Sequence, residues 1–235
     1  MELEIVYQDE EYVAINKPHG LLVHRSPIAK DATEFALQLL RDQISQSVYP
    51  VHRLDRKTGG VLLFTLNENT HKLTQSLFAK SETKKEYWAL VRGYTEDYVE
   101  IDYPLRKENG TLQEAFTSFR TVDRAELAIP FGRYKTSRYS LIKACPTTGR
   151  MHQIRKHLSH IRHPIIADRP HGCNKQNKFF KQKWQMDTML LHACLLQFVH
   201  PITKKELIIK AEIQPEFQRM LDLMGMKLSR INSKD

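Results

Sequence analysis

The sequence predicts an α+β protein. Short β-rich runs and amphipathic helical segments are interspersed along the chain, without the regular strand–helix–strand rhythm of a doubly wound sheet. The 235-residue chain is 41% hydrophobic, which is enough for a core, and it has no long Gly, Ser or Pro tract, so a disordered chain is excluded. No apolar run approaches the roughly 18 residues of a membrane span, and the acidic N-terminus lacks a signal-peptide core.

The N-terminal third is predicted to begin with two strands and a helix. The runs LEIVY and YVAIN flank polar QDEE, and KPHG forms a turn after them. Asp31 and Glu34 fit a capping box, which places a helix after Asp31. The apolar stripe of that helix is Leu37, Leu40 and Ile44.

The middle of the chain is predicted to continue with a loop, a strand, a helix and a further strand. The apolar run VLLF follows the loop VHRLDRKTGG, which suits a buried strand entered through glycines. A helix is expected over Glu68–Lys80, with Leu73 and Leu77 on one face. KKEYWALVRG is typical of a strand that carries two adjacent aromatic residues.

The last elements are two strands and two helices. RYSLIKA predicts a strand and TTGR the turn after it, and ELIIKAEI predicts a later strand. A final short helix is expected over Pro215–Met224. Between them, an amphipathic helix is predicted by a stripe spaced 3, 4 and 3 residues apart, namely Met151, Ile154, Leu158 and Ile161. We find no repeat and no linker, so a single domain over residues 1–235 is expected.

The net charge of +9 is concentrated in one stretch of the chain. Residues 127–186 contain thirteen Lys and Arg residues and one acid, Asp168, giving +12, whereas the remaining residues carry −3. A basic face on a nearly neutral body is typical of proteins that bind a phosphate backbone. A basic solvated surface or an anionic-metabolite site would produce the same pattern.

The loop His52–Gly60, HRLDRKTGG, is the first candidate for chemistry. Asp55 lies between two arginines and a lysine, and nearby cations stabilise an ionised carboxylate. Such a carboxylate could act as a nucleophile or base beside a bound polyanion. A salt-bridged turn that caps a strand explains the same residues without chemistry.

Two further segments are candidates for nucleic-acid contacts. The segment TGRMHQIR at the head of the amphipathic helix could hold phosphates through backbone N–H groups and arginine forks, or it could be a charged helix face. The candidate backbone contacts are Arg150, His152, Lys156 and Arg162. In the strand KKEYWALVRG, Tyr87 could stack on an unpaired base, although core packing is the commoner fate of strand aromatics.

Metal and cofactor sites are not predicted. The histidines at 152, 157, 160 and 163 lack the HExxH spacing of a zinc site, and their only nearby acid is Asp168. No nucleotide-binding glycine motif is present. The three cysteines form neither a disulfide framework nor a CxxC pair.

Together these segments resemble the RluA-type pseudouridine synthases. VHRLDRKTGGVLLF resembles the HRLD-x-x-T-S-G-L-L signature of that family, and KKEYWALVRG resembles its K-x-Y-x-A-x-V-x-G motif. TTGRMHQIRKHLSHIRHPIIAD is similar to the segment T-G-R-x-H-Q-I/L-R-x-H that continues to P-I-x-G-D, and the opening ends in N-K-P-x-G. The motifs fall in the family's order and cover roughly residues 3–213.

The resemblance implies a fold, a reaction and roles for four residues. The fold is a central mixed, largely antiparallel sheet flanked by helices and loops, with an RNA-binding cleft. Asp55 matches the catalytic aspartate, Tyr87 the tyrosine that stacks on the target base, and Arg155 the arginine that pairs with the catalytic carboxylate. Arg53 matches the arginine that fills the space left by the flipped nucleotide. The reaction isomerises uridine to pseudouridine and needs no cofactor or metal.

Within the family, the chain is similar to the members that modify uridine 65 in the T stem of tRNA. The catalytic domain begins at the N-terminus with no S4 domain, and LLVHRS, GRYKTSRYSLI and HIRHPIIAD followed by HG fit those members. The expected partner is tRNA, with no membrane and no protein partner implied, and we expect a cytoplasmic monomer. The same reaction on ribosomal RNA, a non-catalytic RNA-binding protein and a metal-dependent RNA hydrolase are the alternatives.

Two positions depart from the family pattern. Gly59 stands where Ser is usual in T-S-G, which predicts a changed loop hydrogen bond. Ala167 stands where Gly is usual in P-I-x-G-D, and the following RPHGCNKQNK also differs. The second departure bears on the choice of substrate more than on the reaction.

Overall fold

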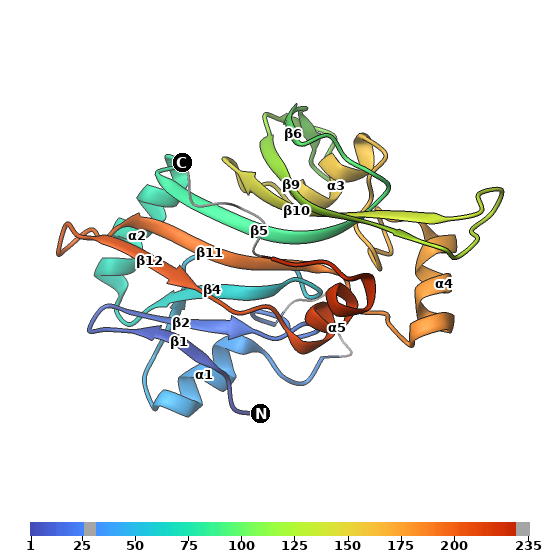
Figure 1. Ribbon diagram of the computed structural model, residues 1–235. Helices are drawn as coiled ribbons and strands as arrows, with labels where there is room; N and C mark the ends of the chain where they lie inside the picture. Colours follow the sequence, from blue (N-terminus) through green and yellow to red (C-terminus); the bar gives the residue numbers. More distant parts are fainter. Residues whose placement is uncertain (26–31, 229–235) are drawn as a thin grey trace. The chain divides into compact units, whose positions relative to one another are not determined.

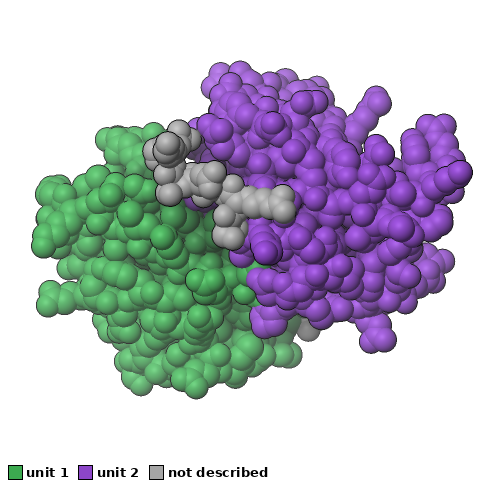
Figure 2. Space-filling view, in the orientation of Figure 1, with its two compact units in different colours: residues 1–85, 192–214 green, residues 86–191, 215–235 purple. Residues whose placement is uncertain are grey.

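The computed structural model describes residues 1–25 and 32–228 of the chain and divides into two compact units. Unit 1 comprises residues 1–85 and 192–214, and unit 2 comprises residues 86–191 and 215–235, as Figure 2 shows in two colours. The chain therefore enters unit 2 once in the middle and again at its end. The expectation of a single domain stays a prediction.

Unit 1 is built on a mixed sheet in the order β1-β2-β4-β11, with β12 paired with β11 and β3 paired with β4 (Figure 1). All of its pairs are antiparallel except β4 with β11. The strands are β1 (Ile5–Gln8), β2 (Tyr12–Lys17), β3 (Tyr49–Pro50), β4 (Gly59–Thr65), β11 (Leu191–Val199) and β12 (Glu206–Lys210). Two helices belong to this unit, α1 (Ala36–Ile44) and α2 (Glu68–Ala79).

Unit 2 is built on a wholly antiparallel sheet in the order β5-β10-β9-β6, beside a small hairpin of β7 and β8. The strands are β5 (Thr83–Arg92), β6 (Tyr98–Asp102), β7 (Leu105–Arg106), β8 (Leu112–Gln113), β9 (Phe116–Leu127) and β10 (Ser137–Pro146). The helices are α3 (Gln153–His160), α4 (Asn174–Trp184) and α5 (Pro215–Met224). The α+β class and the mixed, largely antiparallel pairing are thus confirmed.

Each unit has its own hydrophobic core. In unit 1, Tyr12, Leu63 and Phe198 from three neighbouring strands are buried in one cluster with Ile209. In unit 2, Ile154 and Leu158 of α3 pack on strand residues such as Phe119 and Ile142, which are buried in a second cluster. Burial of apolar surface at roughly 25 cal/mol per Å² is the main force that holds each sheet to its helices.

Helix α1 begins later than the sequence predicts. Asp31, the predicted cap, lies outside the described residues, and residues 32–34 are not helical. Phe35 is the residue before the helix, and its side chain makes no cap hydrogen bond. Instead, the first helical N–H groups, of Ala36 and Leu37, donate to backbone carbonyls of residues 22 and 23. Backbone carbonyls of a neighbouring loop therefore cap this helix, in place of the side chains of the predicted capping box.

Helix α2 begins at Glu68 as predicted and ends at Ala79, one residue before the predicted Lys80. Of its two predicted core residues, Leu77 packs against the unit 1 core but Leu73 does not. Leu73 is 43% exposed, whereas Thr70 and Thr74 are buried. The hydroxyl oxygens of Thr74 and Tyr12 lie 2.5 Å apart in a hydrogen bond, and Asn67 caps the helix by accepting from the Thr70 N–H. Polar contacts with β2 decide the orientation of the helix, which apolar spacing alone could not reveal.

Two other helices were predicted incorrectly or missed. The spacing predicts Met151 on the buried stripe of α3, but Met151 precedes the helix and is 52% exposed. His152 has a φ of +57°, so the chain turns sharply there before α3 starts. Helix α4 lies in the segment that diverges from the family pattern, and its aromatic residues Phe179, Phe180 and Trp184 pack edge to face. Helix α5 has the predicted limits.

Candidate active site and nucleic-acid interface

Asp55 lies in the loop between β3 and β4 of unit 1. The Thr58 N–H donates to the backbone carbonyl oxygen of Asp55 at 3.0 Å, which closes a turn that begins at Asp55. Leu54 is buried at 8% exposure, while Asp55 is partly exposed and Arg53 is exposed. Leu54 thus anchors the loop in the core, while its neighbours Arg53 and Asp55 are accessible to solvent.

Lys17, at the end of β2, is hydrogen-bonded to this loop. Its buried Nζ donates to the carbonyl oxygens of Pro18, Leu21 and Arg56 at 3.0, 2.8 and 3.2 Å. Burial lowers the pKa of Lys17 to about 7, and the negative charge of Asp55 acts in the opposite direction. The sequence singled out the N-K-P-x-G turn only as a likeness, whereas the structure shows it bonded to the loop that carries Asp55.

Gly59 and Gly60 let β4 approach β11 closely where the Asp55 loop enters the sheet. Gly60 has a φ of +107°, and a Cβ there would lie 2.1 Å from the Ala193 carbonyl oxygen. A Cβ on Gly59 would lie 2.4 Å from Nε2 of Gln214. A larger residue at either position would therefore push the two strands or their neighbours apart.

The side chain of Gln214 occupies the space that Gly59 leaves. Its Nε2 donates to the Lys17 carbonyl at 2.8 Å, and its Oε1 accepts from the His19 N–H at 3.0 Å. A glutamine near the end of the chain is thus hydrogen-bonded to the turn after β2, and the predicted change in loop hydrogen bonding at Gly59 stays a prediction.

His52 serves the loop as a neutral ring. Its Nε2 accepts a hydrogen bond from the Leu63 N–H at 3.2 Å, and its ring stacks on Phe78 at 5.5 Å. Burial, with a smaller contribution from Lys85, lowers the pKa of His52 to about 4. The histidine of the HRLD motif is therefore a packing residue that remains uncharged at neutral pH.

Tyr87 and Trp88 of β5 point to opposite faces of the unit 2 sheet, as alternate strand residues do. Tyr87 is partly buried and packs against the cluster that contains Ala89 and Ile154. Lys143 lies over the Trp88 ring at 5.9 Å and pairs with Glu86 at 3.2 Å. Of the two aromatic residues, Tyr87 thus shares its face with the residues that support α3.

Arg155 is buried in α3 and forms a bidentate ion pair with Asp168. Its Nε lies 2.8 Å from Oδ2 and its Nη2 lies 2.9 Å from Oδ1, and the two side chains are only 6% and 1% exposed. The two parallel bonds fix the plane of the guanidinium. Asp168, the single acid of residues 127–186, thus fixes Arg155, which the family motif assigns to the site.

The loop that carries Asp168 is held in an unusual backbone conformation. Ala167 has a φ of +61°, which accounts for the glycine usual there, since glycine adopts this region without strain. Asn177 of α4 accepts from the Ala167 N–H at 2.9 Å and donates to the Asp168 carbonyl at 2.7 Å. A Cβ on Gly172 would lie 2.0 Å from that carbonyl oxygen. The missed helix α4 therefore supports the ion pair.

Two of the four predicted backbone contacts line one cavity. Arg150 and Lys156 border a cavity of about 430 Å³ together with Arg106 and Lys107 of the β7–β8 hairpin. These hairpin cations lie outside the +12 stretch, so the charge pattern of the sequence does not predict them. Their proximity to a positively charged helix start could not be read from spacing.

The other two predicted contacts lie elsewhere in unit 2. Nδ1 of His152 and Nε2 of His171 lie 2.9 Å apart, so these imidazoles are hydrogen-bonded. Arg162 is exposed in the turn after α3, with a φ of +66°. The buried His157 instead bonds Thr117 and the Tyr103 carbonyl and is structural.

The predicted site residues are therefore divided between the two units. Arg53 and Asp55 share one loop of unit 1, while Tyr87, Arg155 and the four backbone candidates belong to unit 2. Within residues 1–25 and 32–228, no group of three or more His, Cys, Asp or Glu side chains could hold a metal ion. Over the same residues, no helix is long and apolar enough to cross a membrane.

The buried lysine that anchors the Asp55 loop in unit 1 and the fixed Arg155 in unit 2 both lie in segments that resemble motifs of the pseudouridine synthases. The family model for RNA pseudouridylate synthase matches residues 11–160. The chain belongs to this family, of the RluA type, and is therefore an isomerase that forms pseudouridine in RNA.

Relatives in several bacteria are similar over almost their whole length. A protein of Vibrio parahaemolyticus named tRNA pseudouridine synthase C is 44% identical over 94% of both chains. Proteins with the same name in Haemophilus influenzae and Salmonella typhimurium are 42% and 41% identical, over 95% and 96% of this chain and 98% and 91% of theirs.

Solved structures share the fold at lower identity. The human RNA pseudouridylate synthase domain-containing protein 1 superposes with a TM-score of 0.72 at 20% identity, covering 96% of each chain. Human domain-containing protein 4 gives 0.72 at 22% identity, over 96% of this chain and 94% of that one. The expected fold is thereby confirmed.

Proposed function

We propose that this protein converts a uridine of tRNA to pseudouridine, and that the target is uridine 65 in the T stem. The observation that supports tRNA as the substrate is the identity of 41–44%, over more than nine tenths of each chain, to relatives named tRNA pseudouridine synthase C. The particular uridine rests on the LLVHRS, GRYKTSRYSLI and HIRHPIIAD segments. The enzyme would work in the cytoplasm, as a monomer that needs no protein partner.

Asp55 is the proposed nucleophile. Its carboxylate would add to the target nucleoside, at ribose C1′ or at uracil C6, as the glycosidic bond to N1 breaks. The detached uracil rotates and its C5 forms a bond to ribose C1′. The Asp55 carboxylate is released, by displacement from C1′ or by elimination from C6, and the proton on C5 leaves while N1 takes up a proton. Every atom of the uridine is kept except that exchanged proton, so the step needs no oxidant, reductant or cofactor.

Three other residues complete the proposed site. Arg155, held in plane by Asp168, would pair with the Asp55 carboxylate. Tyr87 would stack on the target base. Arg53 would fill the space in the RNA helix after the nucleotide is flipped out, at an unstacking cost of a few kcal/mol.

Release of tritium from tRNA labelled at uridine C5 tests the reaction. We expect release with the wild-type protein and none with Asp55→Asn, which should still bind tRNA within about 1 kcal/mol because phosphate contacts dominate affinity. Asp42→Asn, an exposed aspartate on α1, is the matched control and should react like wild type. Residual turnover by Asp55→Asn would remove Asp55 from its role.

Primer extension after carbodiimide treatment tests the position, since it stops at each pseudouridine. A stop at tRNA position 65 supports the proposal. A stop only in ribosomal RNA would favour the alternative substrate, and no release on either RNA would favour a binding protein without catalysis. Loss of turnover on adding EDTA would favour a metal-dependent reaction instead.

A further inference from the structure

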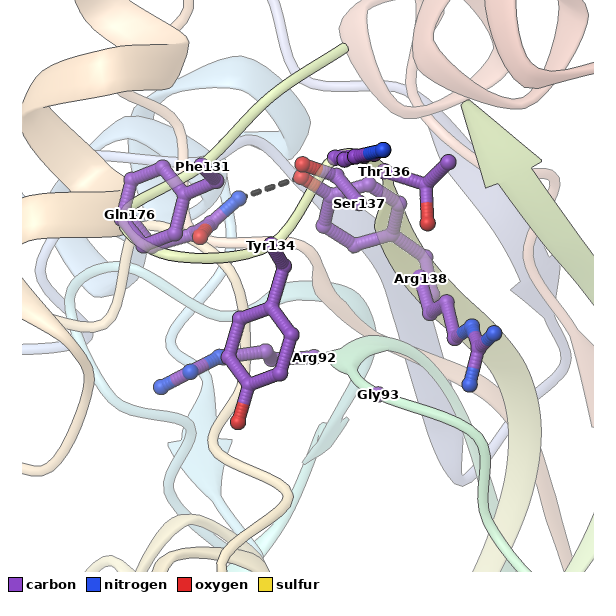
Figure 3. Close-up of a pocket in the computed structure, with 10 residues that line it drawn as sticks. Arg92, Gly93, Phe131, Tyr134, Thr136, Ser137, Arg138 and Gln176 are labelled. Atoms are coloured by element: carbon purple, nitrogen blue, oxygen red, sulfur yellow. Dashed lines mark hydrogen bonds between the residues drawn. The ribbon is translucent and has the colours of Figure 1, made fainter. Parts of the chain in front are cut away.

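A second cavity lies in unit 2, apart from the residues assigned above. It has a volume of about 290 Å³ and is bordered by the end of β5, the tip of the β9–β10 hairpin and helix α4 (Figure 3). Ligand pockets in proteins usually span roughly 300–1,000 Å³, so this cavity suits one small group rather than a helix.

The lining of the cavity is positively charged. Arg92, Lys135 and Arg138 contribute cations, and none of the lining residues is an acid. Arg138 is partly neutralised by Glu126, whose Oε1 lies 3.2 Å from its Nε. Arg92 pairs with no carboxylate among the described residues; its Nη1 contacts the Cys173 sulfur at 3.7 Å. Arg92 is therefore the cation best placed to take up an anionic group.

An aromatic ring faces the cavity beside this cation. Tyr134 is 54% exposed at the hairpin tip, and Figure 3 shows its ring in front of the Arg92 side chain. Arg133 lies over the Tyr134 ring at 5.2 Å, and Phe131 packs on Phe179 of α4 at 5.7 Å. An exposed ring on a supported hairpin is a surface on which a base could stack.

The wall opposite carries a buried amide. Gln176 is 2% exposed, and its Nε2 donates to the Tyr139 hydroxyl, the dashed line in Figure 3. Gln176 lines the cavity, and its Oε1 is an amide acceptor that suits a ligand with an N–H donor.

We propose that this cavity binds one unstacked nucleotide of the RNA substrate, away from the target uridine. The phosphate would lie at Arg92, the base on Tyr134, and a base N–H would reach Oε1 of Gln176. Cations beside an exposed aromatic ring and an edge-reading amide are how proteins hold unpaired nucleotides. The proposal rests on the proposed function, since it presumes an RNA substrate.

Equilibrium binding of tRNA to Tyr134→Ala and Arg92→Gln tests the proposal. Loss of one base stack is worth roughly 1–3 kcal/mol, so Tyr134→Ala should weaken tRNA binding about 5- to 160-fold. Arg92→Gln should weaken it and reduce the salt dependence by about one phosphate contact. In both variants KM should rise by more than kcat falls.

Tyr98→Ala is the matched control. Tyr98 is 47% exposed and carries Arg120 over its ring at 5.0 Å, but it lies on β6, at the far edge of the unit 2 sheet from β5. It should bind tRNA as wild type does. Saturation-transfer NMR with the four nucleoside 5′-monophosphates, against inorganic phosphate, adds a direct readout: base protons should show transfer with wild type and lose it in Tyr134→Ala.

The outcomes separate this proposal from the proposed function. If the wild type forms pseudouridine but Tyr134→Ala and Arg92→Gln bind tRNA as well as Tyr98→Ala does, the nucleotide site is wrong and the function stands. If phosphate binds but no base shows transfer, the cavity is an anion site only. If the wild type forms no pseudouridine in any RNA, the proposed function fails first.

Discussion

The Arg155–Asp168 ion pair gives the sharpest test of how the unit 2 site is held together. Both side chains are more than nine-tenths buried and joined by two hydrogen bonds. Removing one partner of such a pair leaves an uncompensated buried charge, at a cost of about 3–5 kcal/mol. We expect Asp168→Asn to lower the free energy of unfolding by about 3 kcal/mol, toward the lower end because the amide keeps one acceptor.

Urea denaturation followed by circular dichroism measures this loss, and Asp187→Asn is its control. Asp187 pairs with Lys181 at 3.5 Å, but the two side chains are 61% and 62% exposed, so the loss there should be within about 1 kcal/mol. Equal midpoints for the two variants would refute the reasoning.

A double variant separates stability from positioning. In Arg155→Met/Asp168→Leu both charges are removed, and apolar replacement of a buried pair is often neutral or stabilising. This variant should recover most of the stability lost in Asp168→Asn and still show no pseudouridine formation. If it were active, Arg155 would have only a structural role.

Three further predictions concern the loops around the site. The pKa of Lys17 is lowered to about 7 in the folded protein, so between pH 7 and pH 10 the unfolded chain binds more protons than the folded one. The unfolding free energy of the wild type, minus that of Lys17→Met, should therefore rise over this range by up to about 1.4 kcal/mol per pH unit. If denaturation at several pH values gives a constant difference, this prediction is wrong. Gly59→Ser should lower the free energy of unfolding by about 1–3 kcal/mol, because the new side chain overpacks against Gln214. Adding Gln214→Ala should restore part of that stability. If the effects of the two substitutions on the denaturation midpoint simply add, the two residues are not in contact. Ala167→Gly should raise stability by about 0.5–1 kcal/mol, since its φ of +61° strains alanine, and a lower thermal midpoint would show that chain entropy outweighs that strain.

Local signals predicted the elements that depend on local chemistry. Helix α5 begins at Pro215 as expected, because proline suits the first helical turn, and the glycines before VLLF do mark the entry of a buried strand. The family motifs located Asp55, Tyr87 and Arg155 in the chain. Those placements needed only residue identity and short spacings.

Long-range partners could not be predicted from spacing. The first turn of α1 is capped by backbone carbonyls of residues 22 and 23, and no side-chain pattern reports such a cap. Met151 fits a helical stripe, but His152 turns the chain before the helix begins. The ion pair between Asp168 and Arg155 depends on a loop that α4 supports. Helix α4 lies in a lysine-rich segment with no recognisable motif, so this support could not be predicted.

The contacts of Gln214 have a consequence for the order in which the protein can mature. This side chain bonds residues 195 and 197 positions earlier in the chain, next to the turn that Lys17 fastens to the Asp55 loop. During synthesis, that loop must wait for β11 and Gln214 to leave the ribosome before its surroundings are complete. Chains broken off before residue 214 would carry the HRLD, KKEYWALVRG and TGRMHQIR segments but would lack the two hydrogen bonds that Gln214 makes to the turn after β2.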